Sequence, residues 1–258
     1  CALPIYSICV GVNVQDAHQA KLAVDAEFEQ EINTQKVEPL IIEKDLSIIA
    51  LVGEQMRNHP GVSGKMFGVL GRNGINVRAI AQGSSEKNIT AVIAASDVKK
   101  AINVLHEEFF ETSYKQINVY IAGAGNVGGK LIDQIQKQVD YLKKSLRLQI
   151  NIVGIANSKR QLINVEGINL SNWKEQLTNA TAGGIQEYVQ VIIDNNLRNS
   201  VFVDVTAHEA VANVYAQLLE KAVSVVACNK IACSSPYANY AKLKSLARQY
   251  NAAFLFET

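Results

Sequence analysis

Apolar and polar positions alternate along the chain in two periods, one typical of strands and one typical of helices. In the first 42 residues the pattern predicts a strand over 7–14, a helix from Asp16 to about Ile32, and a strand over 37–42. Asp16 is a suitable helix N-cap. Pro39 lacks a backbone N–H, so the second strand can only lie at a sheet edge or begin there. We therefore expect a short α/β segment before a more regular pattern begins.

A more complete unit follows between residues 46 and 109. The predicted elements are strand 46–52, helix 62–70, strand 75–81, strand 89–94 and a helix capped by Ser96 or Asp97. The apolar stripe of that last helix is Val98, Ile102, Leu105 and Phe109. The order β-α-β-β-α is that of a ferredoxin-like sandwich.

From residue 117 onward, near-continuous apolar strands alternate with helices. The predicted strands are 117–122, 150–156, 201–205, 223–227 and one from 253, and the predicted helices are 131–144, 208–221 and 237–250. A strand, a glycine turn and a helix that leads to a parallel strand form a βαβ unit. The fold class is therefore α/β, with a ferredoxin-like part followed by a Rossmann-type parallel sheet, and the seam falls near 111–115.

Composition narrows the class further. A chain of 258 residues with 48% hydrophobic residues is long enough for about two domains with packed cores. The chain has 25 Lys and Arg residues and 24 Asp and Glu residues, a net charge of +1. It therefore has no excess of positive charge that would favour binding to nucleic acid or to a membrane surface. The four cysteines have no histidine cluster nearby, so we expect reduced thiols and no metal site. No run resembles a membrane helix or a leader, and we expect a cytoplasmic protein.

The strongest chemical motif is the run Gly123-Ala-Gly125-Asn-Val-Gly128, which directly follows a predicted strand and opens a helix. In this context Gly123 allows a tight turn, Gly125 lets a pyrophosphate approach the backbone, and Gly128 lets the helix pack against the strand. The helix N-terminus then offers unpaired N–H groups to phosphates. We expect a dinucleotide site at this loop. A purely structural glycine turn is the alternative.

The end of the next strand distinguishes between the two nicotinamide dinucleotides. NAD sites usually place Asp or Glu there, but this chain has Asn157-Ser158-Lys159-Arg160. No carboxylate would repel a 2′-phosphate, and two cations are available to pair with it. NADP(H) is favoured, and NAD(H) stays open. The alternative is that Lys159 and Arg160 are an ordinary solvated pair.

Polar residues at two later strand ends are weaker candidates. Thr206 follows strand 201–205, and Asn229 and Lys230 follow strand 223–227. In an open parallel sheet these side chains should face the cofactor, although Thr206 can also be a helix N-cap. His208 has no evident carboxylate partner, so we interpret it as a residue of the first helical turn rather than an acid or base.

A polar turn, Gln82-Gly83-Ser84-Ser85-Glu86, ends a predicted strand and is expected beside the helix start Gly61-Val62-Ser63-Gly64. Backbone amides at Gly61, Val62 and Ser63 are suited to hold a carboxylate, and Gln82 to hold a small polar side chain. A well-hydrogen-bonded β-turn without a ligand explains the same residues equally well.

Taken together, these residues resemble one family. The motifs that carry the likeness are Ser63-Gly-Lys-Met-Phe67, Ile75-Asn-Val77, Ile80 to Glu86, Gly123 to Gly129, Gly154 to Lys159 and Asn172-Trp173. The first three resemble the ACT regulatory region of aspartokinases. With the others, the chain resembles bifunctional aspartokinase/homoserine dehydrogenases from residue 7 to 258. Monofunctional homoserine dehydrogenases carry their ACT domain after the catalytic part, whereas here it comes first.

The resemblance implies an organisation and an activity. It implies a partial first ACT unit over 1–44, a second ACT domain over 45–113 and an NADP-binding domain over 114–258. The ACT region would bind threonine through Gln82 and form homo-oligomers. The second domain would bind NADP(H), with Asn126, Val127, Thr206 and Lys230 on family cofactor positions, to interconvert L-homoserine and L-aspartate 4-semialdehyde.

The chain also departs from the family. The usual Pro-Asn-Lys-Lys-Ala is here Cys228-Asn-Lys-Ile-Ala232, which puts any role of the second lysine in doubt. Residues 1–6 do not fit the resemblance, and an artefactual origin is open for them. The family's kinase domain and its substrate domain would lie outside this sequence, so we expect no catalytic residues within it. A non-catalytic sensor that binds an amino acid and a nucleotide stays open as an alternative.

Overall fold

The computed structural model describes residues 9–54, 56, 59–82, 87–110 and 114–257. The chain forms two compact units, one of residues 1–58 with 77–96, the other of residues 59–76 with 97–258. Among the described residues, no helix combines the length and the apolar character needed to cross a membrane. The predicted boundary after residue 113 adjoins residues 111–113, which are outside the described ranges.

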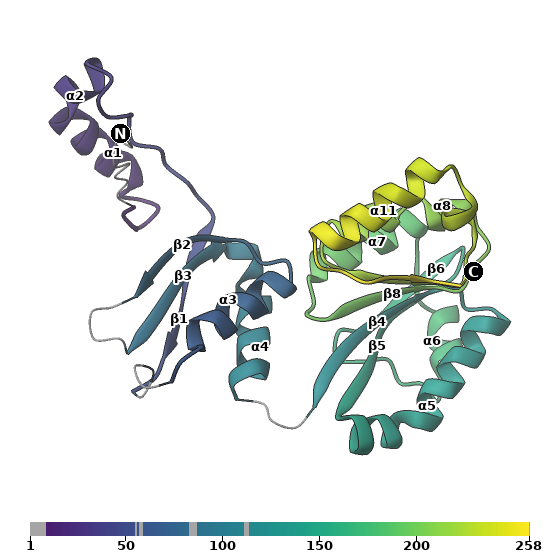
Figure 1. Cartoon of the computed structure of the whole chain (residues 1–258). Coiled ribbons are helices and arrows are strands. Elements are labelled where there is room, and N and C mark those ends of the chain that lie inside the picture. The colour runs from purple at the N-terminus through teal and green to yellow at the C-terminus, as the bar shows by residue number, and fades with distance from the viewer. Residues whose placement is uncertain (1–8, 55, 57–58, 83–86, 111–113, 258) are drawn as a thin grey trace. The chain divides into compact units, whose positions relative to one another are not determined.

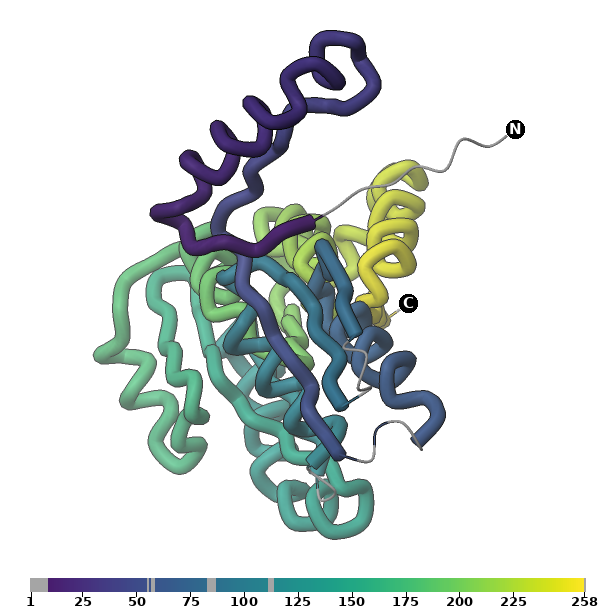
Figure 2. Tube along the Cα trace, turned by 90° about the vertical axis from the view of Figure 1, so that its left-hand side faces the viewer, coloured from purple at the N-terminus to yellow at the C-terminus, as the bar shows by residue number. Residues whose placement is uncertain are grey.

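The first unit contains two short helices and a three-stranded antiparallel sheet. An extended run leads from helix α2 to strand β1 (Figure 2). The elements are α1 (Ala17–Glu27), α2 (Glu29–Asn33), β1 (Leu46–Val52), β2 (Val77–Gln82) and β3 (Asn88–Ala94), with strand order β1-β3-β2. In the central strand, Ile89, Ala91 and Ile93 are buried, which is the period-2 pattern of a strand with one face in a core.

The structure corrects the prediction for the first 42 residues. Neither the described residues 9–14 nor residues 37–42 form a strand, and the predicted helix is interrupted at Phe28, between α1 and α2. Apolar alternation makes a strand only when a neighbouring strand pairs its backbone groups. Val10 and Val14 are instead exposed. Pro39 further weakens the second predicted strand because it cannot donate to a ladder.

The second unit begins with two helices, α3 (Val62–Arg72) and α4 (Val98–Phe109), which pack against each other. Both were predicted within a few residues, and with the strands of the first unit they give the expected order β-α-β-β-α. The predicted stripe of α4 is partly wrong, because Ile102 is 55% exposed. The buried face is formed by Lys100, Ala101, Val104 and Leu105.

The rest of the second unit is a seven-stranded, mostly parallel sheet with strand order β10-β9-β8-β4-β5-β6-β7. Its strands are β4 (Lys115–Ala122), β5 (Leu148–Ala156), β6 (Arg160–Ile163), β7 (Thr181–Ala182), β8 (Ser200–Asp204), β9 (Ser224–Ala227) and β10 (Phe254–Phe256). Only the β5–β6 and β6–β7 pairs are antiparallel. The five parallel strands lie where the sequence predicts them. Strands β6 and β7 were not predicted, because they are short and contain few apolar residues.

Helices cover both faces of this sheet (Figure 1). Helices α7, α8 and α11 lie on one face, and α5 and α6 lie on the other. The helices are α5 (Asn126–Leu146), α6 (Trp173–Thr178), α7 (Ile185–Asn195), α8 (Glu209–Ala212), α9 (Tyr215–Leu219), α10 (Ile231–Ser234) and α11 (Tyr237–Gln249). The single helix predicted over 208–221 is thus two short helices. Helices α6, α7 and α10 were not predicted.

Each face of the sheet has its own apolar core. On one face a row of buried rings, Tyr120, Tyr188, Phe202, Tyr215 and Phe254, runs across the strands with neighbouring centroids 6.0–6.4 Å apart. On the other face, Ile121 and Ile155 pack with Ile132 of α5 and Trp173 of α6. Because both faces are covered, the central strands are near-continuous apolar runs, as expected of a doubly wound parallel sheet.

Candidate functional site

The sheet reverses its direction of growth beside β4. The chain passes from β4 through α5 to β5 on one side, and later returns to β8 on the other side of β4. In open α/β sheets, ligands bind outside the carboxyl ends of the strands at such a switch point. The glycine-rich segment 123–128 lies at this point, because β4 ends at Ala122.

The glycine loop has the backbone geometry that its sequence predicts. Gly123 has a φ of +109°, and its N–H donates to the Ala156 carbonyl oxygen at 2.8 Å, which ties the loop to the end of β5. Helix α5 begins at Asn126, directly after Gly125. A Cβ on Gly128 would lie 1.9 Å from the Gly123 carbonyl oxygen, so only glycine allows this close contact of helix and loop.

Gly125, Asn126 and Val127 are exposed at the first turn of α5. The first N–H groups of a helix have no intrahelical acceptor, and the helix dipole favours an anion there. The loop therefore fits a dinucleotide pyrophosphate: the backbone is open at Gly125, and a Cβ there would meet nothing within 4 Å.

The segment after β5 is a tight turn that Asn157 organises. The Asn157 side-chain oxygen accepts hydrogen bonds from the backbone N–H groups of Lys159 and Arg160, each at 2.8 Å. The Arg160 guanidinium donates to the Ala180 carbonyl oxygen at 2.6 Å. All four residues of the turn, including Ser158, are exposed. The turn thus presents Lys159 to solvent and holds Arg160 against a neighbouring segment.

The glycine loop and this turn line one pocket of about 400 Å³. Its lining residues are Ala124, Gly125, Asn157, Ser158, Lys159, Trp173, Lys174 and Leu177. Trp173 is buried, and the Lys174 ammonium lies 5.6 Å from the centre of its ring. Sequence reasoning did not place Lys174 at the site. The signal that could have found it is the Asn172-Trp173 motif directly before it.

The ends of β8 and β9 carry the remaining predicted cofactor residues. Thr206 is half-buried, and its hydroxyl accepts the His208 N–H at 3.3 Å. The His208 Nδ1 atom accepts the Ala210 N–H at 3.2 Å and caps α8, so His208 does lie at the start of a helix. Lys230 is exposed, whereas Asn229 is 2% exposed.

Asp204, the last residue of β8, was not predicted as a site residue. It is fully buried, and its carboxylate accepts hydrogen bonds from the Thr206 N–H, the Tyr215 hydroxyl and the Asn229 amide. Burial, together with the adjacent Asp204 carboxylate, raises the pKa of Tyr215 far above its ordinary value. Tyr215 is therefore a permanent hydrogen-bond donor to Asp204.

The predicted effector residues lie on two elements. Gln82 is the exposed last residue of β2, in the first unit. Gly61, Val62 and Ser63 form the start of α3, in the second unit, where Gly61 has a φ of +90° and its carbonyl oxygen accepts the Lys65 N–H at 2.8 Å. The rest of the predicted turn, residues 83–86, is outside the described residues.

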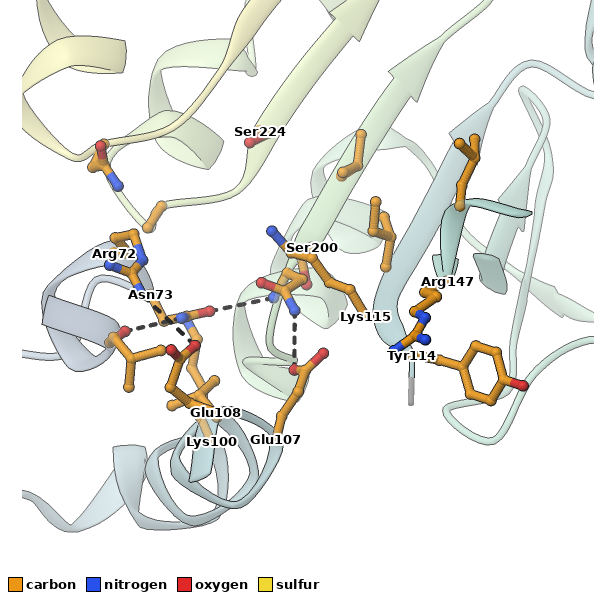
Figure 3. Close-up of a pocket in the computed structure, with 18 residues that line it drawn as sticks. Arg72, Asn73, Lys100, Glu107, Glu108, Tyr114, Lys115, Arg147, Ser200 and Ser224 are labelled. Atoms are coloured by element: carbon orange, nitrogen blue, oxygen red, sulfur yellow. Dashed lines mark hydrogen bonds and ion pairs between the residues drawn. The ribbon is translucent and has the colours of Figure 1, made fainter. Parts of the chain in front are cut away.

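A larger cavity of about 680 Å³ lies at the other ends of the strands in the second unit (Figure 3). Lys115, Ser200 and Ser224 line it at the beginnings of β4, β8 and β9, and Glu107 and Glu108 line it from α4. Eight residues of β4, about 25 Å, separate it from the glycine loop. It is therefore distinct from the predicted cofactor site.

Both acidic side chains of this cavity lie close to an arginine. Glu107 accepts a hydrogen bond from Asn199 and lies 3.3 Å from the Arg198 guanidinium, and Arg72 lies 3.7 Å from Glu108. Figure 3 shows Arg72 of α3 and Glu108 of α4 at this cavity. The cavity thus belongs to the packing of α3 and α4 within the second unit.

Comparison with known families agrees with the geometry of the glycine loop. A family model described as the NAD-binding domain of homoserine dehydrogenase matches residues 123–257, more than half of the chain. The chain belongs to the homoserine dehydrogenase family. The match begins at the first glycine of the loop and runs to the end of the described sheet. A second model, described as an ACT domain, matches residues 49–109.

Curated relatives match almost the whole chain. It is 37% identical over 254 residues to a bifunctional aspartokinase/homoserine dehydrogenase of Haemophilus influenzae, a match that covers 98% of this chain and 31% of the relative. It is 34% identical to the chloroplastic bifunctional aspartokinase/homoserine dehydrogenase 2 of Arabidopsis thaliana, with 98% and 28% coverage. The chain therefore spans about a third of the length of these relatives.

Solved structures of homoserine dehydrogenases are also similar. A hyperthermophilic archaeal homoserine dehydrogenase in complex with NADPH is 25% identical with a TM-score of 0.45, covering 55% of this chain and 44% of that one. The Staphylococcus aureus homoserine dehydrogenase is 20% identical with a TM-score of 0.41, covering 56% and 33%.

Proposed function

We propose that the chain is the regulatory and cofactor-binding portion of a bifunctional aspartokinase/homoserine dehydrogenase. The whole enzyme would phosphorylate L-aspartate and reduce L-aspartate 4-semialdehyde to L-homoserine with NADPH. The observation that carries the proposal is the glycine loop at the switch point of a domain of the homoserine dehydrogenase family. The order of the two matched domains and the 98% coverage by bifunctional relatives support it.

In this proposal the bound dinucleotide would supply the hydride of the reduction. The first turn of α5 would hold its pyrophosphate, and the turn after β5 would hold the adenosine ribose. Thr206 and Lys230 would face its nicotinamide half, because β8 and β9 lie on the other side of β4 from β5. The groups that act on the substrate would belong to the rest of the enzyme.

We infer a preference for NADP(H) over NAD(H) from the turn after β5. It has no carboxylate to bind a ribose diol or repel a 2′-phosphate, and Lys159 is exposed within the pocket. Arg160 is less available, because its guanidinium bonds to the Ala180 carbonyl oxygen. Lys159 is thus the side chain on which the preference mainly depends.

The test is a calorimetric titration of the Lys159→Ala variant with NADPH and with NADH. Loss of one phosphate contact should weaken NADPH binding about tenfold, or ~1.4 kcal/mol, and leave NADH binding nearly unchanged. Lys137→Ala is the matched control, since Lys137 is exposed near the middle of α5, about 17 Å along the helix axis from its start. Equal losses for both nucleotides, or none, would refute the role of Lys159.

For the ACT region, we propose threonine as the effector, with Gln82 as one of its ligands. The exposed, polar end of β2, where Gln82 lies, supports this assignment. Threonine should release heat on binding to the unchanged chain and none when it is added to Gln82→Ala. Gln149 is an exposed glutamine on β5, so Gln149→Ala is the control and should bind threonine as the unchanged chain does. If Gln82→Ala still releases heat on threonine binding, Gln82 is not a ligand of the effector.

We further propose that the chain works in the cytoplasm as a homo-oligomer. Strands β1 and β2 are the two edges of the three-stranded sheet, and an unpaired edge favours pairing with another copy. Light scattering of the purified chain should give at least twice the mass of 28.1 kDa, and a monomer at micromolar concentration would exclude this assembly.

A further inference from the structure

Asp204 joins the ends of two neighbouring strands. Its backbone carbonyl oxygen accepts the Cys228 N–H at 2.8 Å, and its side chain accepts the Asn229 amide at 3.0 Å. Its other carboxylate oxygen accepts the Thr206 N–H at 2.7 Å. A single buried side chain therefore fixes the residues that follow both β8 and β9.

The Asn229 side chain is fully used inside the protein. Its amide nitrogen donates to Asp204 and to the His208 carbonyl oxygen at 3.1 Å, and its oxygen accepts the Ile231 N–H at 3.1 Å. With 2% of its surface exposed, Asn229 has little left to offer a ligand. Its hydrogen bonds instead fix the backbone on both sides of Lys230, which is exposed.

A buried carboxylate is stable only when donors compensate for its lost hydration. Asp204 has three such donors, of which the Tyr215 hydroxyl lies closest, at 2.5 Å. Tyr215 is itself fully buried within the aromatic row of the core. The group that orders the two strand ends is thus anchored in the rigid centre of the domain.

We propose that Asp204 is a positioning residue that sets Thr206 and Lys230 against the nicotinamide half of the dinucleotide. This inference rests on the proposed function, because it needs the dinucleotide to cross the switch point from β5 to β9. The adenosine half would lie over the turn after β5, on the far side of β4 from Asp204. Asp204 should therefore affect one half of the ligand and not the other.

The experiment compares two ligands of the full 258-residue chain, NADPH and adenosine 2′,5′-bisphosphate, which lacks the nicotinamide half. In Asp204→Asn the new amide group offers one acceptor oxygen to three donors, so the strand ends lose their order. We expect NADPH to bind at least tenfold more weakly and the bisphosphate to bind within twofold of the unchanged chain. The fluorescence change of the reduced nicotinamide on binding should also decrease.

Asp194→Asn is the matched control, because Asp194 is an exposed carboxylate of α7 that accepts a hydrogen bond from the Gln190 side chain at 2.8 Å. If Asp204→Asn does not fold, Tyr215→Phe replaces it. That variant removes one donor, keeps the ring, and should show the same selective loss of NADPH to a smaller degree. Equal weakening of both ligands, or no weakening, would overturn the positioning role. An unchanged chain that binds neither ligand would instead overturn the proposed function.

Discussion

At the scale of single residues, Gly128 and Gly129 offer a sharp contrast within one turn of α5. A Cβ at Gly128 would meet the Gly123 carbonyl oxygen at 1.9 Å, whereas a Cβ at Gly129 would meet only Trp173, at 3.9 Å. Gly128→Ala must therefore push the helix away from the loop, at a cost of ~1–3 kcal/mol. Gly129→Ala should stabilise the helix by ~0.5–1 kcal/mol, because alanine has the higher helix propensity.

Thermal unfolding followed by circular dichroism measures this contrast. The midpoint should fall for Gly128→Ala and stay level or rise for Gly129→Ala, and NADPH affinity should fall only in the first variant. If both variants unfold at the same temperature, the close approach of helix and loop is not required.

The sequence predicts the glycine loop well, since a local spacing after a strand defines it. It does not predict the role of Asp204, whose partners Tyr215 and Asn229 lie 11 and 25 residues away. Asn229 was predicted to face the cofactor because it follows a strand, yet its amide bonds inside the protein. Which side of a strand end a polar residue occupies depends on neighbours that are distant in sequence.

At the scale of elements, helix α4 buries a lysine that its apolar stripe did not predict. Lys100 is 7% exposed, and its ammonium donates to the Asn196 side-chain oxygen at 3.0 Å. Asn196 in turn donates to Asp97 at 2.7 Å. Burial lowers the pKa of Lys100 from 10.5 to about 8, although the nearby Asp97 opposes this shift.

This lowered pKa predicts a pH dependence of stability. Between pH 8 and 10.5 the unfolded chain holds a proton on Lys100 that the folded chain has lost, so the contribution of Lys100 to stability rises with pH across this window. The difference in unfolding midpoint between the unchanged chain and Lys100→Met should therefore increase from pH 8 to 10.5. Buried tyrosines titrate in the opposite sense, but they are common to both proteins and cancel in the difference.

Lys99→Met provides the control for this titration, because Lys99 is the exposed neighbour on the same helix. The unfolding midpoint of Lys99→Met should equal that of the unchanged chain at every pH. If the difference in unfolding midpoint between the unchanged chain and Lys100→Met stays constant from pH 8 to 10.5, burial does not lower the pKa of Lys100.

The elements that the sequence predicts correctly are those with strong periodicity and a partner in the fold. Strands β4 and β5 agree with prediction because each ends in a run of buried apolar residues and pairs with the other. The strand predicted over 37–42 fails because nothing among the described residues pairs with it. The helix predicted over 208–221 is interrupted at Asn213 and Val214. The sequence does not predict this interruption, because neither residue is a glycine or a proline.

At the scale of the whole molecule, the sequence predicts the alternation of strands and helices but not the order of strands in the sheet. That order, with β4 between β5 and β8, creates the switch point and brings the residues after β4, β5, β8 and β9 to the carboxyl edge of one sheet. We infer that this edge binds a pyridine dinucleotide through the loop 123–128.

The most direct test is a calorimetric titration of the chain and of Gly125→Asp with NADPH. A Cβ at Gly125 meets nothing within 4 Å, so the variant should fold normally while its carboxylate repels the pyrophosphate. Gly71→Asp, at an equally open glycine of α3, is the control. We expect one NADPH per chain for the unchanged and control proteins and at least a hundredfold loss of NADPH affinity for Gly125→Asp. A folded chain that binds no NADPH, or a Gly125→Asp variant that binds it normally, would show that the loop 123–128 is not the dinucleotide site.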